Sequence, residues 1–139
     1  MKYVAMLVAL LMSGVVCAEQ NPLQDIKQLV WKNRIILILS AEDDAGHEQL
    51  LEKYDDEIID RDIVWFVLRD SEVVTNYAEK LSSEFVSITK SSFPIGSGSV
   101  LLIGKDGGIK TRAKQLNLNA IFREIDSMPM RQQEMESSS

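Results

Sequence analysis

The chain has 139 residues, of which 45% are hydrophobic and 26% charged, with a formal net charge of −6. Such a composition suits one globular domain with its own core. The acidic balance offers no basic surface for nucleic acid or anionic lipid, and we expect neither as a partner.

The N-terminal residues have the three-part pattern of a secretory signal peptide. Lys2 precedes an almost unbroken apolar stretch, and residues 13–18 lead through small side chains to the polar residues that follow Ala18. The stretch is shorter than the roughly 20 residues of a membrane-spanning helix, so we expect a signal peptide at 1–18 and no stable membrane anchor. The mature protein is then periplasmic or secreted.

Cys17 is the only cysteine of the chain. Its surroundings fit lipid attachment poorly, because Val16 and Gly14 stand where a small residue and a leucine-like residue would be needed. If cleavage falls after Ala18, the mature chain has no thiol. This excludes disulfide exchange and thiol-dependent peroxidase chemistry, which both require a thiolate.

The elements before the second strand are predicted from their apolar spacing. Asn21-Pro22 favours the start of a short helix. Residues 35–39 form a continuous apolar run, typical of a strand buried on both faces. An acidic loop at 41–45 precedes a helix that we expect to extend to about Ile59. The buried side of this helix would comprise Leu50, Leu51, Tyr54, Ile58 and Ile59.

A second buried strand is predicted at 63–68, and apolar residues at spacings of three and four predict a helix over about 71–88. The late part of this segment, residues 85–89, fits either a helix or a strand. A loop rich in Ser and Gly follows at 91–99. We expect Trp31 and Trp65 to pack in the core, beside the first helix and the second strand.

The C-terminal part predicts a hairpin and a helix. Residues 100–103 and 109–112 are expected strands, joined by a tight turn at 105–108 that contains Asp-Gly. Asn117 or Asn119 is expected to cap a helix whose buried face ends at Met128. The domain would therefore occupy residues 19–128, and residues 129–139 would form a polar tail that frays.

The order of these elements predicts an α/β fold. A helix between the first two strands makes them parallel, whereas the short turn between the last two makes them antiparallel. The expected architecture is a three-layer sandwich of the thioredoxin-like type, with a mixed four-stranded sheet and helices on both faces.

Two stretches carry a resemblance to a known family: residues 102–110, LIGKDGGIK, and residues 125–135, IDSMPMRQQEM. They resemble stretches of a domain of unknown function that occurs as short exported bacterial proteins. The same domain occurs in the sushi-repeat-containing proteins of animals and in a related matrix protein named for its coiled-coil domain. The resemblance covers residues 23–134 and implies a thioredoxin-like fold, but it lends no settled biochemical activity.

The loop after the first strand would hold the active site of a redox enzyme of this fold, and it has no cysteine. Asp43, Asp44 and His47, with Glu42 and Glu48, could instead bind a metal. The better interpretation is that these carboxylates cap the following helix. We expect no metal, no cofactor and no catalytic residue here, although a metal-assisted or otherwise cysteine-independent enzyme is the alternative.

The remaining candidates lie nearer the C-terminus. Residues 104–108 differ from a phosphate-binding loop because Asp106 follows Lys105 and a strand follows the turn. Met130 and Arg131 belong to a methionine-containing segment that could serve as an adaptable binding surface, although methionines also fill core edges.

The sequence thus predicts an exported, non-catalytic interaction module with an unidentified protein partner. Its candidate interaction surface comprises Asp43, Asp44, His47, Lys105, Asp106, Met130 and Arg131. The sequence leaves the oligomeric state open.

Overall fold

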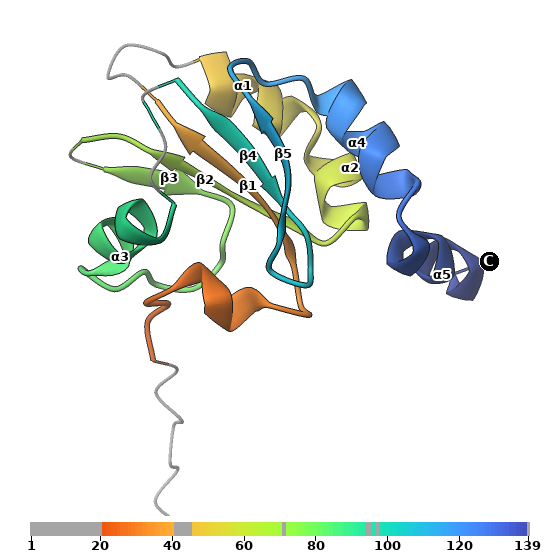
Figure 1. Ribbon diagram of the computed structural model, residues 1–139, viewed down its shortest axis with the longest axis horizontal. Coiled ribbons are helices and arrows are strands. Elements are labelled where there is room, and N and C mark those ends of the chain that lie inside the picture. The colour runs from red at the N-terminus through yellow and green to blue at the C-terminus, as the bar shows by residue number, and fades with distance from the viewer. Residues whose placement is uncertain (1–20, 41–45, 71, 94–95, 97, 139) are drawn as a thin grey trace, which may run out of the picture.

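The structure is a computed structural model, and it describes residues 21–40, 46–70, 72–93, 96 and 98–138 (Figure 1). Within this part of the chain, a five-stranded mixed sheet lies between two groups of helices. The strands are β1 (Arg34–Leu39), β2 (Ile63–Leu68), β3 (Val73–Thr75), β4 (Val100–Ile103) and β5 (Ile109–Ala113). The helices are η1 (Ile26–Leu29), α1 (Gly46–Lys53), α2 (Asp55–Asp60), α3 (Phe85–Ser92), α4 (Leu118–Asp126) and α5 (Pro129–Ser137).

The strands lie in the order β3-β2-β1-β4-β5. The central strands β1 and β2 are parallel, with Ile36 beside Trp65, while β4 pairs antiparallel with β1. Both central strands are buried almost throughout, which confirms the prediction from their continuous apolar runs.

Alternate residues of the strands supply two separate cores. Ile36 and Ile38 of β1 face α1, α2 and α4, whereas Ile35 and Leu37 face η1 and α3. The two groups of helices therefore cover opposite faces of the sheet (Figure 1).

The sheet has five strands in place of the four expected, because the segment predicted as a single helix over 71–88 forms two elements. Its first part is β3, which pairs antiparallel with β2 and sets Val74 beside Val67. Its later part begins α3 at Phe85, whose side chain is completely buried. The β-branched residues Val73 and Val74 suit a strand, and pairing with β2 outweighs a spacing that also fits a helix.

Two buried positions expected from the sequence are exposed. Trp31 has 65% of its surface exposed, because it follows η1 in a left-handed backbone conformation that turns it away from the core. Ile59 is 60% exposed, because its neighbour Ile58 takes the buried position on α2 and adjacent helical residues point in different directions. The expected single helix is also interrupted at Tyr54, between α1 and α2. Trp65 is buried, as predicted.

Two further differences concern the ends of the domain. The first helix begins only after Asp25, whose side chain accepts a hydrogen bond from the amide of Lys27 in a capping box. The C-terminal segment expected to fray contains α5, with Pro129 in its first turn and Arg131 buried. Pro129 thus starts a helix as well as following one, because its fixed φ suits a first helical position.

The tight turn between β4 and β5 is confirmed. Gly107 has a φ of +84°, a conformation that favours glycine, and its amide donates to the carbonyl of Gly104. The hairpin contains a β-bulge opposite the bond between Leu102 and Ile103, near the start of β5.

Asn117 caps α4, since its side chain accepts a hydrogen bond from the amide of Ala120 at 3.1 Å. We expect Asn117→Ala to lower the free energy of unfolding by about 1 kcal/mol, because one helix N–H would lose its partner. Urea denaturation measures the change. Asn119→Ala is the matched control, and a loss of equal size in both variants would contradict the assignment of the cap.

Candidate functional site

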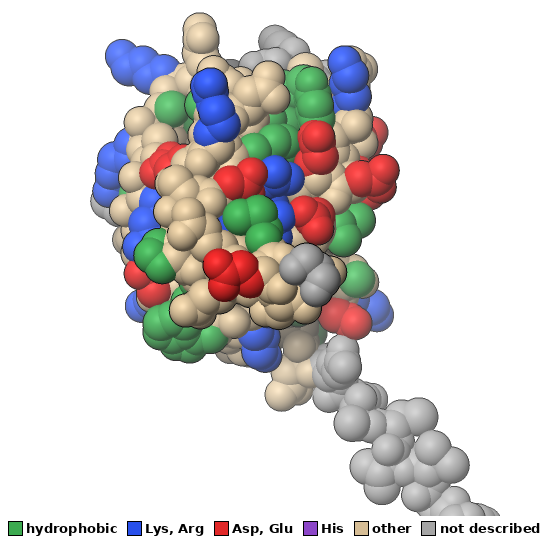
Figure 2. Space-filling model, turned by 90° about the vertical axis from the view of Figure 1, so that its right-hand side faces the viewer, with side chains coloured by type: hydrophobic (Ala, Val, Ile, Leu, Met, Phe, Trp, Pro, Cys, Tyr) green, Lys and Arg blue, Asp and Glu red, His purple; other side chains and the backbone are tan. Residues whose placement is uncertain are grey.

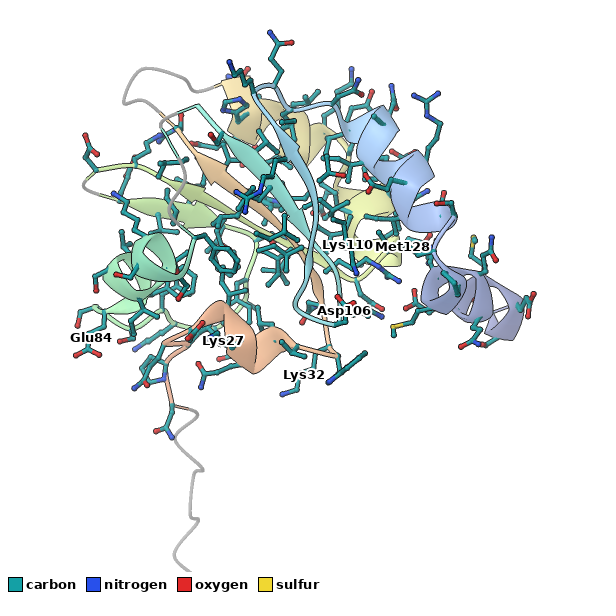
Figure 3. The ribbon with its side chains drawn as sticks, in the orientation of Figure 1. Lys27, Lys32, Glu84, Asp106, Lys110 and Met128 are labelled. Carbon is teal, nitrogen blue, oxygen red and sulfur yellow. The ribbon has the colours of Figure 1, made fainter. Side chains whose placement is uncertain are left out.

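A pocket of about 400 Å³ lies at the end of the sheet where β1 begins and β4 turns into β5. Residues from three parts of the chain line it: Trp31, Arg34, Gly104, Lys105, Asp106, Lys110, Met128, Pro129 and Met130. Figure 3 shows Asp106, Lys110 and Met128 gathered at this end of the sheet. A volume of this size is in the range of pockets that receive a small ligand or a side chain of a partner.

Trp31 forms one wall of the pocket and has an unusual backbone. Its φ is +69°, and its amide donates a hydrogen bond of 2.6 Å to the carbonyl of Lys105. A left-handed conformation costs a non-glycine residue about 1–2 kcal/mol, and the turn between β4 and β5 holds it in place. The tryptophan side chain is therefore held largely exposed to solvent beside the pocket.

The opposite wall comes from the junction of α4 and α5. Met128 has an extended backbone at the start of α5, and Pro129 and Met130 follow in its first turn. Met130 is 37% exposed, so its flexible thioether side chain can adapt to whatever enters the pocket. The face that carries α4 and α5 has hydrophobic side chains between basic and acidic ones (Figure 2).

Lys110 lines the pocket beside Gly104. A β-carbon at Gly104 would lie 2.5 Å from Cε of Lys110, so the absence of a side chain there gives Lys110 its path. The ammonium group then bonds the carboxylate of Asp106 at 2.8 Å. This bond, with one from the amide of Gly108, lowers the pKa of Asp106.

Beneath the pocket, ion pairs join α5 to the sheet. Arg34 is only 1% exposed and donates to both carboxylate oxygens of Glu134 and to the carbonyl of Arg61. Glu134 also pairs with Lys105, which in turn pairs with Asp62 at 2.9 Å. Residues that are far apart in sequence thus hold the pocket together.

A second set of ion pairs fixes the start of α5. Arg131 is 5% exposed and pairs with Asp60 at 2.6 Å and with Asp126 at 3.2 Å. Asp126 also pairs with Arg61 at 2.8 Å. Each charged group in this set has a partner of opposite charge. Because Asp60 and Asp126 lie outside α5, the pairs formed by Arg131 hold α5 in position.

The cations lower the pKa values of two carboxyl groups in this network. For Asp126, the hydrogen bond from Arg61 is the main cause, and it outweighs the opposing effect of burial. For Glu134, burial is the largest single influence and opposes ionisation, but the hydrogen bonds from Arg34 and Lys105 together lower the pKa.

These lowered pKa values predict that acid destabilises the fold. The ordinary pKa is 3.8 for Asp and 4.5 for Glu, and the folded values lie below these. The two ionised carboxylates therefore contribute their full stabilisation of the fold at a pH above their pKa values in the unfolded chain. This stabilisation is lost as the pH falls through their pKa values in the folded protein. Thermal denaturation should show a lower Tm at pH 3 than at pH 7. Asp126→Asn/Glu134→Gln should reduce this difference, and an unchanged difference would contradict the assignment.

The structure places the predicted interaction residues in different parts of the molecule. Lys105, Asp106 and Met130 line the pocket, with Arg131 buried behind them. His47 lies on α1, which follows the far end of β1, so it does not join this group (Figure 1).

The acidic loop lies largely outside the described residues, which do not include Asp43 and Asp44. Of the acidic residues proposed there as metal ligands, Glu48 is described, and it pairs with Arg69. Within the described residues, no group of three acidic, histidine or cysteine side chains is placed to hold a metal. Within the same residues, no helix is long and apolar enough to cross a membrane.

Trp31 and Arg34 were not among the predicted site residues. The exposed position of Trp31 depends on its left-handed backbone, for which the sequence offers no glycine as a signal. Arg34 precedes an apolar run, which suggests a solvated strand end, and its partner Glu134 lies 100 residues away.

A family model described as Domain of unknown function (DUF4174) matches residues 25–134. The chain belongs to this family. The DUF4174 match contains every residue that lines the pocket, together with both ion-pair groups that fix α5. It also contains residues 102–110 and all but the last residue of 125–135, the two stretches whose resemblance to a domain of unknown function is described above. Neither the curated proteins nor the solved structures provide a match to the chain.

Proposed function

We propose that this DUF4174 protein is an exported, non-catalytic interaction module with a thioredoxin-like fold. In this proposal a partner protein inserts an apolar side chain between Trp31 and Met130. The kinship with the sushi-repeat-containing proteins, suggested by residues 102–110 and 125–135, is part of the same proposal.

The order of elements supports the thioredoxin-like assignment. If β3 at one edge and α5 at the C-terminus are set aside as additions, the chain after η1 runs strand, helices, strand, helix, strand, strand, helix. The first two of these strands are parallel and the last two are antiparallel. This is the arrangement on which the expectation was based, with α1 and α2 together in place of one helix.

Export and the lack of thiol chemistry rest on the N-terminal pattern. Cleavage after Ala18 would remove Cys17, the single cysteine. Intact-mass measurement of the exported protein tests this directly. A product that begins at Glu19 supports the proposal, whereas a product that still carries Cys17 contradicts it.

The exposure of Trp31 is the observation that carries the interaction proposal. A large aromatic side chain is kept 65% exposed by a backbone conformation that is itself unfavourable. Unfavourable backbone conformations persist where the surroundings determine them, and they concentrate at ligand-binding sites. Tryptophan beside a pocket is also among the side chains that contribute most to protein interfaces.

In this proposal, the ion pairs beside the pocket hold its walls in place before a partner arrives. Arg34 and Arg131 tie α5, and with it Met130, to the rest of the domain. A preformed pocket loses less conformational entropy on binding, so more of the contact energy appears as affinity.

Site-specific photocrosslinking tests the proposal in the cells that export the protein. A photoreactive phenylalanine analogue is placed at Trp31 in one variant and at Ile59, which is similarly exposed on α2, in another. We expect a discrete adduct from position 31 that Met130→Glu abolishes, and no such adduct from position 59. No adduct at position 31, or the same adducts at both positions, would contradict the proposal.

A further inference from the structure

One edge of the sheet carries a concentration of positive charge that the pocket does not explain. β5 is the last strand in the sheet order, so one side of its backbone has no neighbouring strand. Residues 109–115, IKTRAKQ, contain three basic residues and no acidic one, although the whole chain has a net charge of −6.

Two of these basic residues are available for new contacts. Lys110 pairs with Asp106, but no described residue forms an ion pair with Arg112 or Lys114, and both are exposed. Arg112 lies opposite Leu101 of β4, which places it on the sheet face that packs against η1 and α3. Lys114 comes directly after the last residue of β5, Ala113, and is two positions from Arg112.

We propose that β5 is a docking edge for an extended, acidic segment of a partner protein. The segment would add to the sheet as a further strand, with main-chain hydrogen bonds to β5 and with carboxylates opposite Arg112 and Lys114. Opposite charges on directly paired strands attract, and side chains at alternate positions of the segment would meet both cations.

The same charges decide between possible occupants. A second copy that paired through its own β5 would bring basic residues together, and like charges opposite each other are destabilising. Basic side chains on an edge strand also protect against pairing with apolar chains. An acidic segment is the occupant that these charges attract.

The bulge limits where the added strand can begin. It lies between the pairs Leu102–Thr111 and Ile103–Ile109, so the regular part of β5 starts at Thr111. Bulges disturb the hydrogen-bonding pattern of an edge. The regular docking edge is thus residues 111–113 of β5, with Lys114 directly after it. This edge is separate from the pocket between Trp31 and Met130.

A nine-residue peptide in which Val and Glu alternate, blocked at both ends and labelled with fluorescein, is the probe. We expect saturable binding by fluorescence anisotropy, which weakens as salt rises, and shifts in the NMR signals of the backbone amides of residues 109–115. The same peptide with Lys in place of Glu should not bind. A peptide N-methylated on alternate residues keeps its charge but loses main-chain donors along one edge, and it should also fail to bind.

Charge reversal of the edge provides the matched test. Arg112→Glu/Lys114→Glu should weaken binding by at least about fivefold, as expected for the loss of two exposed ion pairs. Lys27→Glu/Lys80→Glu changes the net charge equally at exposed positions away from β5 and should bind as the wild type does. Trp31→Ala should also bind the peptide normally, which separates this edge from the pocket. The proposal is overturned if no peptide binds, if the N-methylated peptide binds equally, or if both charge reversals have the same effect.

Discussion

Replacement of Arg34 by Met is expected to lower the free energy of unfolding by about 3 kcal/mol. Arg34 is 1% exposed and bonds Glu134 through two nitrogens, so its loss removes one of two cationic partners of a partly buried carboxylate. Breaking a buried pair on one side costs about 3–5 kcal/mol. Glu134 keeps Lys105 as a second partner, so we expect a loss of stability at the lower end of this range. The carbonyl of Arg61 also loses its hydrogen-bond donor, which adds to the loss.

Urea denaturation measures this loss, and two further variants show its origin. Arg123→Met removes an exposed arginine from α4 and should change the free energy of unfolding by less than about 0.5 kcal/mol. Arg34→Lys keeps the charge but cannot form the same two-nitrogen contact, so an intermediate loss is expected. Equal losses in Arg34→Met and Arg123→Met would show that the buried ion pair does not stabilise the fold.

The same variant should loosen α5 selectively. Glu134 of α5 would keep Lys105 but lose Arg34, so hydrogen exchange of the α5 amides should become faster than that of β1 and β2. Uniform faster exchange across the sheet would instead indicate global destabilisation. The comparison therefore shows whether the ion pair acts on the pocket wall or on the whole domain.

Local chemistry was enough to predict the centre of the fold. The two apolar runs at β1 and β2 are short, rich in β-branched residues and bounded by polar residues, which favours a strand buried on both faces. The turn at Gly107 is predictable for the same reason, and the cap of α4 is narrowed to Asn117 or Asn119, since each depends on contacts within a few residues. The structure selects Asn117.

Features that depend on distant partners were not predictable in this way. Val73 and Val74 fit a helix spacing as well as a strand, and the choice follows from pairing with β2. The burial of Arg34 depends on Glu134, which is remote in the sequence. Of the candidate site, local motifs identify Lys105, Asp106 and Met130, whereas the sequence predicts Trp31 in the core beside the first helix.

Replacement of Trp31 by Asn should separate stability from binding. Asn tolerates the left-handed conformation better than Trp does, and the lost side chain is mostly in solvent. We therefore expect the free energy of unfolding to stay the same or to rise by up to about 1 kcal/mol. The partner protein identified by crosslinking, once purified, should bind this variant about 30-fold more weakly or worse, since a tryptophan at the centre of an interface commonly contributes 2 kcal/mol or more.

Calorimetric titration of the partner and urea denaturation of the variant give the two quantities independently. Ile59→Asn is the control, because it removes another exposed apolar side chain without touching the pocket, and it should leave binding unchanged. A loss of more than about 2 kcal/mol of stability in Trp31→Asn would assign the tryptophan a structural role. Binding of wild-type strength by a stable Trp31→Asn variant would exclude the pocket as the interaction site. A stable variant that no longer binds is the outcome that the exposed, left-handed tryptophan predicts.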